Sequence, residues 1–305
     1  MTKRVLVTGA TGFIGRHAIS PLLERGFEVH THGYHNSLDY EGVTSHETDL
    51  LSDSAKELCA KIRPTHLLHF AWYAVPGKYW TSPENERWVE ATQKLLTAFA
   101  ESGGSRAVLA GTCAEYDWTK PQEFLKEDSP IAPATLYGQS KNKIHEWAEN
   151  FARREGTSLA WGRIFFLYGP HEAPERLVPS VVNSLLDGKE ARTTSGEQVR
   201  DLLHVEDVAS AFVALLDSDV EGAVNIASGT PLQLKDVVNA IADILGKSEL
   251  VRLGALPERP HEPARLVADV QRLRDEVGWQ PHYPLREGLE NTISWWKANK
   301  SNSKR

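Results

Sequence analysis

Short apolar runs and longer helical patterns alternate along the first half of the chain. The apolar runs cover residues 4–8, 27–32, 66–71, 107–112 and 158–166, and helical periodicity covers 13–23, 53–62, 84–102 and 136–154. Alternation at this spacing predicts strands joined by helices, and therefore a parallel sheet with helices on both faces. The expected fold class is α/β with a doubly wound parallel sheet.

The pattern loses this regularity after residue 165. Prolines at 170, 174 and 179 interrupt it, a helix is expected at about 178–187, and the last third mixes short strands with helices. We therefore expect a large lobe from residues 1–165 with a contribution from about 200–227, a smaller mixed α/β substrate-binding lobe from residues 166–199 and 228–298, and a flexible tail at 299–305.

Composition and charge narrow the class of protein. The 305 residues include 41% hydrophobic and 25% charged residues, and the net charge is -7. The longest apolar runs are far shorter than the roughly 20 residues of a membrane span, and no secretory cleavage site is visible, so a cytoplasmic protein without a membrane partner is expected. The negative charge argues against a nucleic-acid partner. Cys59 and Cys113 form no C-x-x-C pair, so no disulfide or thiolate metal site is expected.

A glycine-rich turn connects the first strand to the first helix. In "VLVTGATGFIGRH", Gly9, Gly12 and Gly15 stand between a β-branched run and a helical pattern. Glycines there permit a tight turn and let backbone N–H groups approach a pyrophosphate at the positive end of a helix. The turn predicts a dinucleotide site.

The G-x-x-G-x-x-G spacing of "TGATGFIG" resembles the extended short-chain dehydrogenase/reductases, and the later motifs resemble the branch of the NAD-dependent epimerase/dehydratase family that modifies nucleotide sugars. The resemblance extends from Val5 to about Trp296. It implies a Rossmann-type large lobe that binds NAD(P) through Gly9, Thr11, Gly12, Phe13, Ile14 and Gly15.

The sequence lacks an acidic residue at the position that usually contacts the adenosine ribose. In the family an acidic residue there binds the 2′-hydroxyl of NAD, but counting from Gly26 places Gly33 at that position. His35, Asn36 and Ser37 remain as possible donors to a 2′-phosphate, so the sequence favours NADP(H) over NAD(H). Asp49 and Leu50 match the family's adenine contacts, with a solvated turn as the alternative. His30 and His32 lack a companion carboxylate or thiolate, so no metal site is expected.

Tyr137 and Lys141 share one face of a predicted helix, because residues four apart lie together. A neighbouring ammonium favours the phenolate, so the pKa of Tyr137 is expected to be lowered and the phenol to exchange a proton near neutral pH. The resemblance implies that this Tyr-x-x-x-Lys pair is catalytic and also contacts the cofactor. It further implies that Thr112, at the end of a strand and four residues before Tyr116, holds the substrate oxygen.

Two positions after Thr112 lack the acids that family members use for dehydration. Relatives that dehydrate nucleotide sugars carry an Asp-Glu pair there, and this chain has Cys113 and Ala114. A 4,6-dehydratase is therefore not expected. Glu115 is one position beyond the place of the Asp-Glu pair, so a solvated or supporting carboxylate is expected. Both Cys113 and Glu115 are also candidates for lining the substrate site. Cys113 has no neighbouring histidine and carboxylate that would make it a nucleophile.

The remaining motifs point to a nucleotide sugar. "HFAWYAVPGKYW" resembles the family's His-x-Ala-Ala segment, which places Phe70, Ala71 and Trp72 beside the cofactor. Its rings, with Tyr79 and Trp80 among them, are expected either to stack on a ligand or to pack within the loop. Phe166 replaces the family's asparagine, and Arg200 matches its diphosphate-binding arginine. Either Arg259 or Arg265 is a further phosphate candidate. The candidate substrate contacts are Trp72, Tyr73, Lys78, Cys113, Glu115, Phe166, Arg200 and Arg265.

The resemblance and the missing acid pair together favour one reaction. The expected activity is NAD(P)H-dependent reduction of a nucleotide-activated 4-keto-6-deoxy sugar, with the proton supplied by Tyr137. An NAD-dependent nucleotide-sugar 4-epimerase is the first alternative, and a protein that senses NAD(P) without catalysis is the second. The expected partner is a nucleotide-diphosphate sugar, and family members often form homodimers.

Overall fold

Seven parallel strands form the large sheet of the computed structural model, which describes residues 3–34, 38–258 and 262–302. All neighbouring strands pair in parallel, in the order β3-β2-β1-β4-β5-β6-β10. This arrangement confirms the expected α/β class. The strands are β1 (Arg4–Thr8), β2 (Glu28–Gly33), β3 (Val43–Glu47), β4 (His66–His69), β5 (Arg106–Thr112), β6 (Ser158–Ile164) and β10 (Gly222–Ile226).

Helices cover both faces of this sheet, and each face has its own apolar core. Along β1, Val5 and Val7 belong to one core and Leu6 belongs to the other, because alternate side chains point to opposite faces. The first face is covered by η1 (Gly15–Ala18), α1 (Ile19–Glu24), α6 (Val205–Leu216) and α8 (Gln271–Asp275). The second is covered by α2 (Ala55–Ile62), α3 (Glu84–Glu101) and α4 (Leu136–Glu155).

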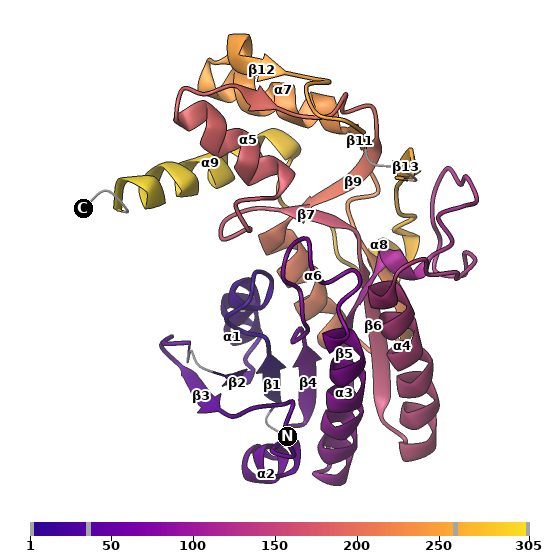
Figure 1. The fold of residues 1–305 in the computed structure, drawn as a ribbon. Coiled ribbons are helices and arrows are strands. Elements are labelled where there is room, and N and C mark those ends of the chain that lie inside the picture. Colours follow the sequence, from indigo (N-terminus) through magenta and orange to yellow (C-terminus); the bar gives the residue numbers. More distant parts are fainter. Residues whose placement is uncertain (1–2, 35–37, 259–261, 303–305) are drawn as a thin grey trace.

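A smaller lobe lies beyond the carboxyl ends of the strands, where the arrowheads of β1 and β4 point in Figure 1. One of its sheets joins β7 (Phe166–Tyr168), β9 (Val199–His204), β11 (Pro231–Gln233) and β13 (Arg265–Leu266), and the other joins β8 (Ala191–Arg192) and β12 (Val251–Arg252). A third apolar core lies among α5 (Leu177–Leu186), α7 (Leu234–Leu245) and α9 (Leu285–Asn302). Short 3-10 turns η2 (Cys113–Glu115) and η3 (Ser248–Leu250) complete the elements.

The chain passes between the lobes more than once. The run predicted as one strand at 158–166 divides into β6 in the large sheet and β7 in the smaller one. Of the residues expected to join the large lobe from about 200–227, β9 belongs to the smaller sheet, whereas α6 and β10 pack with the large sheet. In a doubly wound sheet, ligands bind at the carboxyl ends where the strand order reverses, which here lies between β1 and β4.

The expected tail is shorter than predicted. The prediction of a flexible tail from 299 is wrong for 299–302, because α9 continues to Asn302. Lys300 ties this end to α5 by donating from Nζ to the Asn183 carbonyl at 3.0 Å and to Asp187 at 2.8 Å. Over the described ranges, no helix has the length and apolar character needed to cross a bilayer.

Candidate active site

The glycine turn after β1 is packed too closely for side chains. A Cβ atom on Gly9, where φ is +71°, would lie 2.7 Å from the Ala71 amide nitrogen, and one on Gly15 would lie 2.2 Å from the Gly9 carbonyl oxygen. Gly12 closes the turn by donating its N–H to the Gly9 carbonyl at 3.0 Å. The three glycines therefore bring the backbone of the turn against the end of β4, as a dinucleotide loop requires.

Arg16 is a cation beside this turn that the sequence analysis did not single out. Its guanidinium donates to the carbonyls of Thr11 and Gly12, and its Nη1 lies 2.6 Å from Nδ1 of His171. Burial lowers the pKa of His171 to about 4, so its neutral ring can accept this bond. The signal in the sequence was a basic residue directly after the third glycine. Of the other predicted residues here, Ile14 packs on the first core and Phe13 is half-buried.

The adenosine side is only partly described. β2 ends at Gly33, so its last residue offers no carboxylate, and His35, Asn36 and Ser37 lie outside the described residues. Asp49 accepts the Leu51 N–H at 2.9 Å, and Leu50 is buried in the second core. Metal-binding groups of His, Cys, Asp and Glu were not found among the described residues. His30 instead stacks on His46, with a ring nitrogen separation of 3.0 Å.

Buried polar contacts fix the segment after β4. His69 lies between the hydroxyls of Thr8, at 2.6 Å, and Thr92, at 3.0 Å. Phe70 packs edge-on against Phe212. Trp72 donates from its indole nitrogen to Asn85 at 2.8 Å, so this ring is held by a hydrogen bond as well as by packing.

Thr112, Tyr137 and Lys141 come together at the carboxyl end of β5. Thr112 is the last residue of β5, and Tyr137 and Lys141 lie in the first turns of α4. α4 can approach because Gly138 faces the Ala114 carbonyl, where a Cβ atom would come within 2.4 Å. Tyr137 is hydrogen-bonded to the Thr112 side chain. The side-chain oxygen of Thr112 also accepts the Ala114 N–H at 3.2 Å, which leaves its own proton free to be donated.

Lys141 is buried between a carbonyl and an aromatic ring. Its Nζ donates to the Ala110 carbonyl at 2.8 Å and lies 3.8 Å from the centroid of a Trp72 ring. Burial lowers the pKa of Lys141 to about 7, and the charge of Glu115 acts in the opposite direction. The ammonium is therefore held by a dipole and a π face, and it is poised to titrate near neutrality.

The expected lowering of the Tyr137 phenol pKa is wrong for the free protein. Burial raises the pKa of Tyr137 above its ordinary value, although the hydrogen bond with Thr112 opposes this. The prediction failed because it counted the ammonium four residues away and left out desolvation, which here is the larger effect. Tyr137 is consequently a protonated acid at neutral pH.

Aromatic rings surround the Tyr137 phenol. Tyr79 meets its ring edge-on at 4.9 Å between centroids, and Trp80 does so at 5.8 Å. Arg176, from the loop before α5, donates to the Tyr79 hydroxyl at 3.5 Å. The aromatic loop thus packs on Tyr137 itself. Tyr73 is half-buried nearby in the chain, and Lys78 is exposed.

Arg200 and Arg265, two of the arginines predicted to contact phosphate, bind other groups of the protein. Arg200 is only 2% exposed, pairs with Glu262 at 3.0 Å, and lies 5.2 Å over the ring of Phe166. Arg265 donates to the Glu123 carbonyl at 2.8 Å and lies over Phe124. Arg259 lies outside the described residues. Nη1 of Arg200 donates to the Val199 carbonyl and its Nη2 to Glu262, so the structure does not show this guanidinium open to a diphosphate.

The segment after Thr112 offers no acid to a substrate. Cys113 and Ala114 are both buried, and burial raises the pKa of the Cys113 thiol to about 12. A thiol of this kind is neither a proton donor near neutrality nor a thiolate nucleophile.

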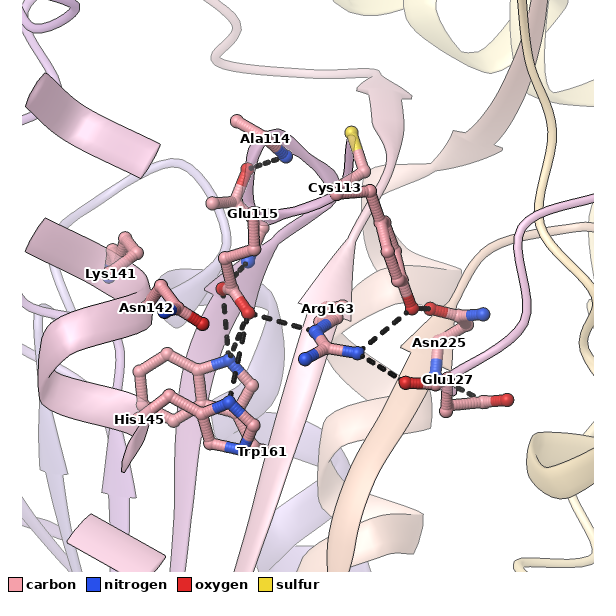
Figure 2. A network of polar contacts seen from close by, with 12 residues as sticks. Cys113, Ala114, Glu115, Glu127, Lys141, Asn142, His145, Trp161, Arg163 and Asn225 are labelled. Atoms are coloured by element: carbon pink, nitrogen blue, oxygen red, sulfur yellow. Dashed lines mark hydrogen bonds and ion pairs between the residues drawn. The ribbon is translucent and has the colours of Figure 1, made fainter. Parts of the chain in front are cut away.

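Glu115 agrees with the expectation of a supporting carboxylate, whereas the alternative of a solvated carboxylate and its place among the candidate substrate contacts are wrong. Its side chain is fully buried, and Figure 2 shows the carboxylate directed toward Trp161 and Arg163. It accepts the Thr112 N–H at 2.9 Å, Nε1 of Trp161 at 3.0 Å and Nε of Arg163 at 2.8 Å. The carboxylate thus accepts from a backbone N–H, an indole and a guanidinium inside the protein, which is why it tolerates burial.

Comparison with known proteins places the chain in a family. The model of the NAD dependent epimerase/dehydratase family matches residues 5–227. The chain belongs to this family. The match confirms the resemblance found in the sequence, and it covers the glycine turn and the Thr112, Tyr137 and Lys141 positions of this family member.

The relatives of this family member carry out different reactions on nucleotide sugars. It is 27% identical to UDP-glucuronic acid decarboxylase 1 of Xenopus tropicalis, over 97% of this chain and 72% of that protein. It is 28% identical to UDP-glucose 4-epimerase of Corynebacterium glutamicum, over 97% and 96%. The structure of the Thermus thermophilus UDP-glucose 4-epimerase in complex with NAD superposes with a TM-score of 0.85, at 27% identity, over 96% and 99%.

Proposed function

We propose that this chain is an NAD(P)H-dependent reductase of a nucleotide-activated 4-keto-6-deoxy sugar. The observation that carries the proposal is the protonated Tyr137 phenol, hydrogen-bonded to Thr112 beside Lys141, in a site where positions 113 and 114 hold no carboxylic acid. Reduction of a ketone needs one proton donor at the carbonyl oxygen, and Tyr137 in its resting state is that donor.

The glycine turn and the end of β4 are suited to the dinucleotide. The close backbone contacts at Gly9 and Gly15 keep side chains out of the turn, which supports an approach of its N–H groups to a pyrophosphate, and Arg16 adds a cation there. When bound, NAD(P)H supplies the hydride that adds to the keto carbon. We propose NADPH as the preferred form, because β2 ends without the carboxylate that would repel a 2′-phosphate.

The residues of the chain handle the proton. Thr112 donates to the substrate carbonyl oxygen, since its own oxygen is already occupied by the Ala114 N–H. Tyr137 transfers its phenolic proton to that oxygen as negative charge develops on it. The Lys141 ammonium then stabilises the phenolate that remains, because it is held in a buried site where charge interactions are strong.

Replacing Tyr137 tests the proposal. With a nucleotide-linked 4-keto-6-deoxy sugar and NADH or NADPH in parallel, the wild-type protein should consume reduced cofactor and the Tyr137→Phe variant should lose about a hundredfold or more in kcat. The exposed Tyr40→Phe variant is the matched control and should keep wild-type activity. A higher kcat/KM with NADH would contradict the NADPH preference alone.

An NAD-dependent 4-epimerase is the second candidate, favoured by the epimerases among the relatives. Epimerisation begins with oxidation and therefore needs a base, whereas burial here keeps Tyr137 protonated. Interconversion of two sugar nucleotides without net consumption of reduced cofactor would establish the epimerase and refute the reductase. Inactivity on all keto sugars, with binding intact, would favour a sensing protein.

A further inference from the structure

We propose that Glu115 is a positioning residue for the catalytic set: its buried carboxylate fixes the end of β5 at Thr112 and supplies the negative charge that faces the Lys141 ammonium. The inference rests on the proposed function of that site, but it concerns a residue that touches neither substrate nor cofactor. Glu115 acts through Thr112 and Lys141.

Glu115 contacts the backbone at the end of β5. Glu115 Oε1 accepts the Thr112 N–H at 2.9 Å, while the Thr112 side chain accepts the Ala114 N–H, so the two residues cap each other across η2. Such a reciprocal cap removes the freedom of the backbone at the turn. The Thr112 hydroxyl is thereby fixed at the position from which it meets Tyr137.

Lys141 is attached to the same end of β5 as Glu115. Lys141 binds the Ala110 carbonyl, and Glu115 binds the Thr112 N–H, two residues further along β5. Backbone groups two residues apart on a strand point to the same side. The ammonium and the carboxylate are therefore attached to backbone groups on one side of β5.

Aromatic and titratable groups lie around Lys141. The Trp72 ring lies over Nζ of Lys141, and Tyr137 precedes Lys141 by one turn of α4. His69, on which the Lys141 charge acts, stays neutral because burial lowers its pKa to about 3. Glu115 is thus the anion whose charge favours protonated Lys141.

Arg163 forms the other side of the Glu115 site. It pairs with the carboxylate at 2.8 Å and is itself held by the Tyr116 hydroxyl at 3.1 Å and the Glu127 carbonyl at 2.8 Å. The Trp161 indole also donates to the carboxylate, and the ring of His145 stacks on that indole, with its Nδ1 3.9 Å from Glu115. These contacts hold the Glu115 carboxylate in one place, as a positioning group must be.

The test is the titration of Lys141 itself, which needs neither substrate nor cofactor. In the full chain labelled with lysine carrying ¹³C at Cε, the Lys141→Arg spectrum identifies the Lys141 resonance. Glu115→Gln should lower the apparent pKa of Lys141 by about one unit, because an opposite charge nearby shifts a buried group by that order. With substrate, the loss of activity at rising pH should move to lower pH by the same amount.

Two further variants keep the result interpretable. Glu127→Gln removes a carboxylate that caps the Asn225 N–H on the far side of Arg163, so the Lys141 titration should stay at its wild-type position. If Glu115→Gln alone does not fold because Arg163 is left unpaired, the Glu115→Gln and Arg163→Gln double variant removes both charges and should still lower the pKa of Lys141.

An unchanged Lys141 titration in a folded Glu115 variant would overturn the proposal and leave Glu115 a purely structural group. An equal shift in Glu127→Gln would overturn it as well. Because the titration is read without catalysis, a failure of the reductase assay and a failure of this proposal are separate results.

Discussion

Glu172 is a second carboxyl group in an unusual state, and it has a consequence for stability. It lies in the loop after β7, is 8% exposed, and its Oε2 has no hydrogen-bond partner. Burial raises the pKa of Glu172 to about 8, although Arg176 opposes the shift. No residue pattern indicated this state, since Glu172 stands in a proline-bearing polar loop whose burial depends on the packing of the smaller lobe.

This pKa predicts a pH dependence of folding that Glu172→Gln should remove. The folded protein holds the Glu172 proton up to about pH 8, whereas the unfolded chain releases it near the ordinary carboxyl pKa, so this contribution to stability is lost as pH rises between the two values. At about pH 8.5 the variant should be more stable than wild type by about 2–4 kcal/mol.

Thermal melts from about pH 5 to pH 8.5 check the Glu172 prediction. The melting temperature of wild type should fall over this range more than that of Glu172→Gln, and the exposed Glu175→Gln should follow wild type. Parallel curves for wild type and Glu172→Gln would contradict the pKa assigned to this residue.

Arg16, Glu115 and Glu172 show what residue patterns alone could not establish. Tyr137 and Lys141 were predictable because four residues separate them on one helix, so local geometry brings them together. Glu115 and Arg163 are separated by 48 residues and meet only through the pairing of β5 with β6. Such a pair leaves no local signal in the sequence, which is why a solvated and a supporting Glu115 both remained open before the structure was known.

At the scale of elements, the approach of α4 to η2 determines whether Tyr137 reaches Thr112. Gly138→Ala would place a Cβ atom 2.4 Å from the Ala114 carbonyl and 2.9 Å from Cβ of Pro133, so α4 must move away. Alanine is a better helix former than glycine by about 1 kcal/mol, so this substitution should not weaken α4 itself. A loss of activity would therefore come from the displacement of α4. We expect kcat to fall at least about tenfold, since small displacements of catalytic groups are costly.

Circular dichroism and the reductase assay together check the Gly138 prediction. The helical signal should be unchanged while kcat falls, and the exposed neighbour Gln139→Ala should leave both unchanged. Full activity in Gly138→Ala would mean that α4 does not need this close approach.

The elements themselves were predictable to different degrees. The buried strands of the large sheet were apparent from their apolar runs, but β3 was missed because "VTSHE" is mostly polar at the edge of the sheet. The strands of two or three residues in the smaller lobe carry no periodicity, because pairing with β9 and β8 defines them. The division of 158–166 into β6 and β7 was likewise invisible, as both halves are apolar.

At the scale of the whole molecule, Arg16 connects the two lobes beside the glycine turn. It reaches from the glycine turn of the large lobe to His171 on the loop after β7. Arg16→Ala removes both the cation and this connection, so we expect the Kd for NADPH to rise about tenfold, which corresponds to roughly one charge-assisted contact.

Fluorescence titration with NADPH checks the Arg16 prediction. Arg25→Ala, which removes a surface guanidinium paired with Asp217, should bind NADPH as wild type does. Equal affinities for wild type and Arg16→Ala would show that the guanidinium supports the backbone of the turn without contributing to the ligand.

The crossing of the chain between lobes also affects how the protein can fold as it is synthesised. β10, the strand that completes the large sheet beside β6, and α6, which covers the first core, follow β7, β8 and β9 in the chain. While the ribosome is making residues 166–204, Val108 and Ala160 have no α6 to cover them, and the β6 edge is open. The nascent amino-terminal segment therefore presents apolar surface and an unpaired strand to other chains until residue 226 has emerged.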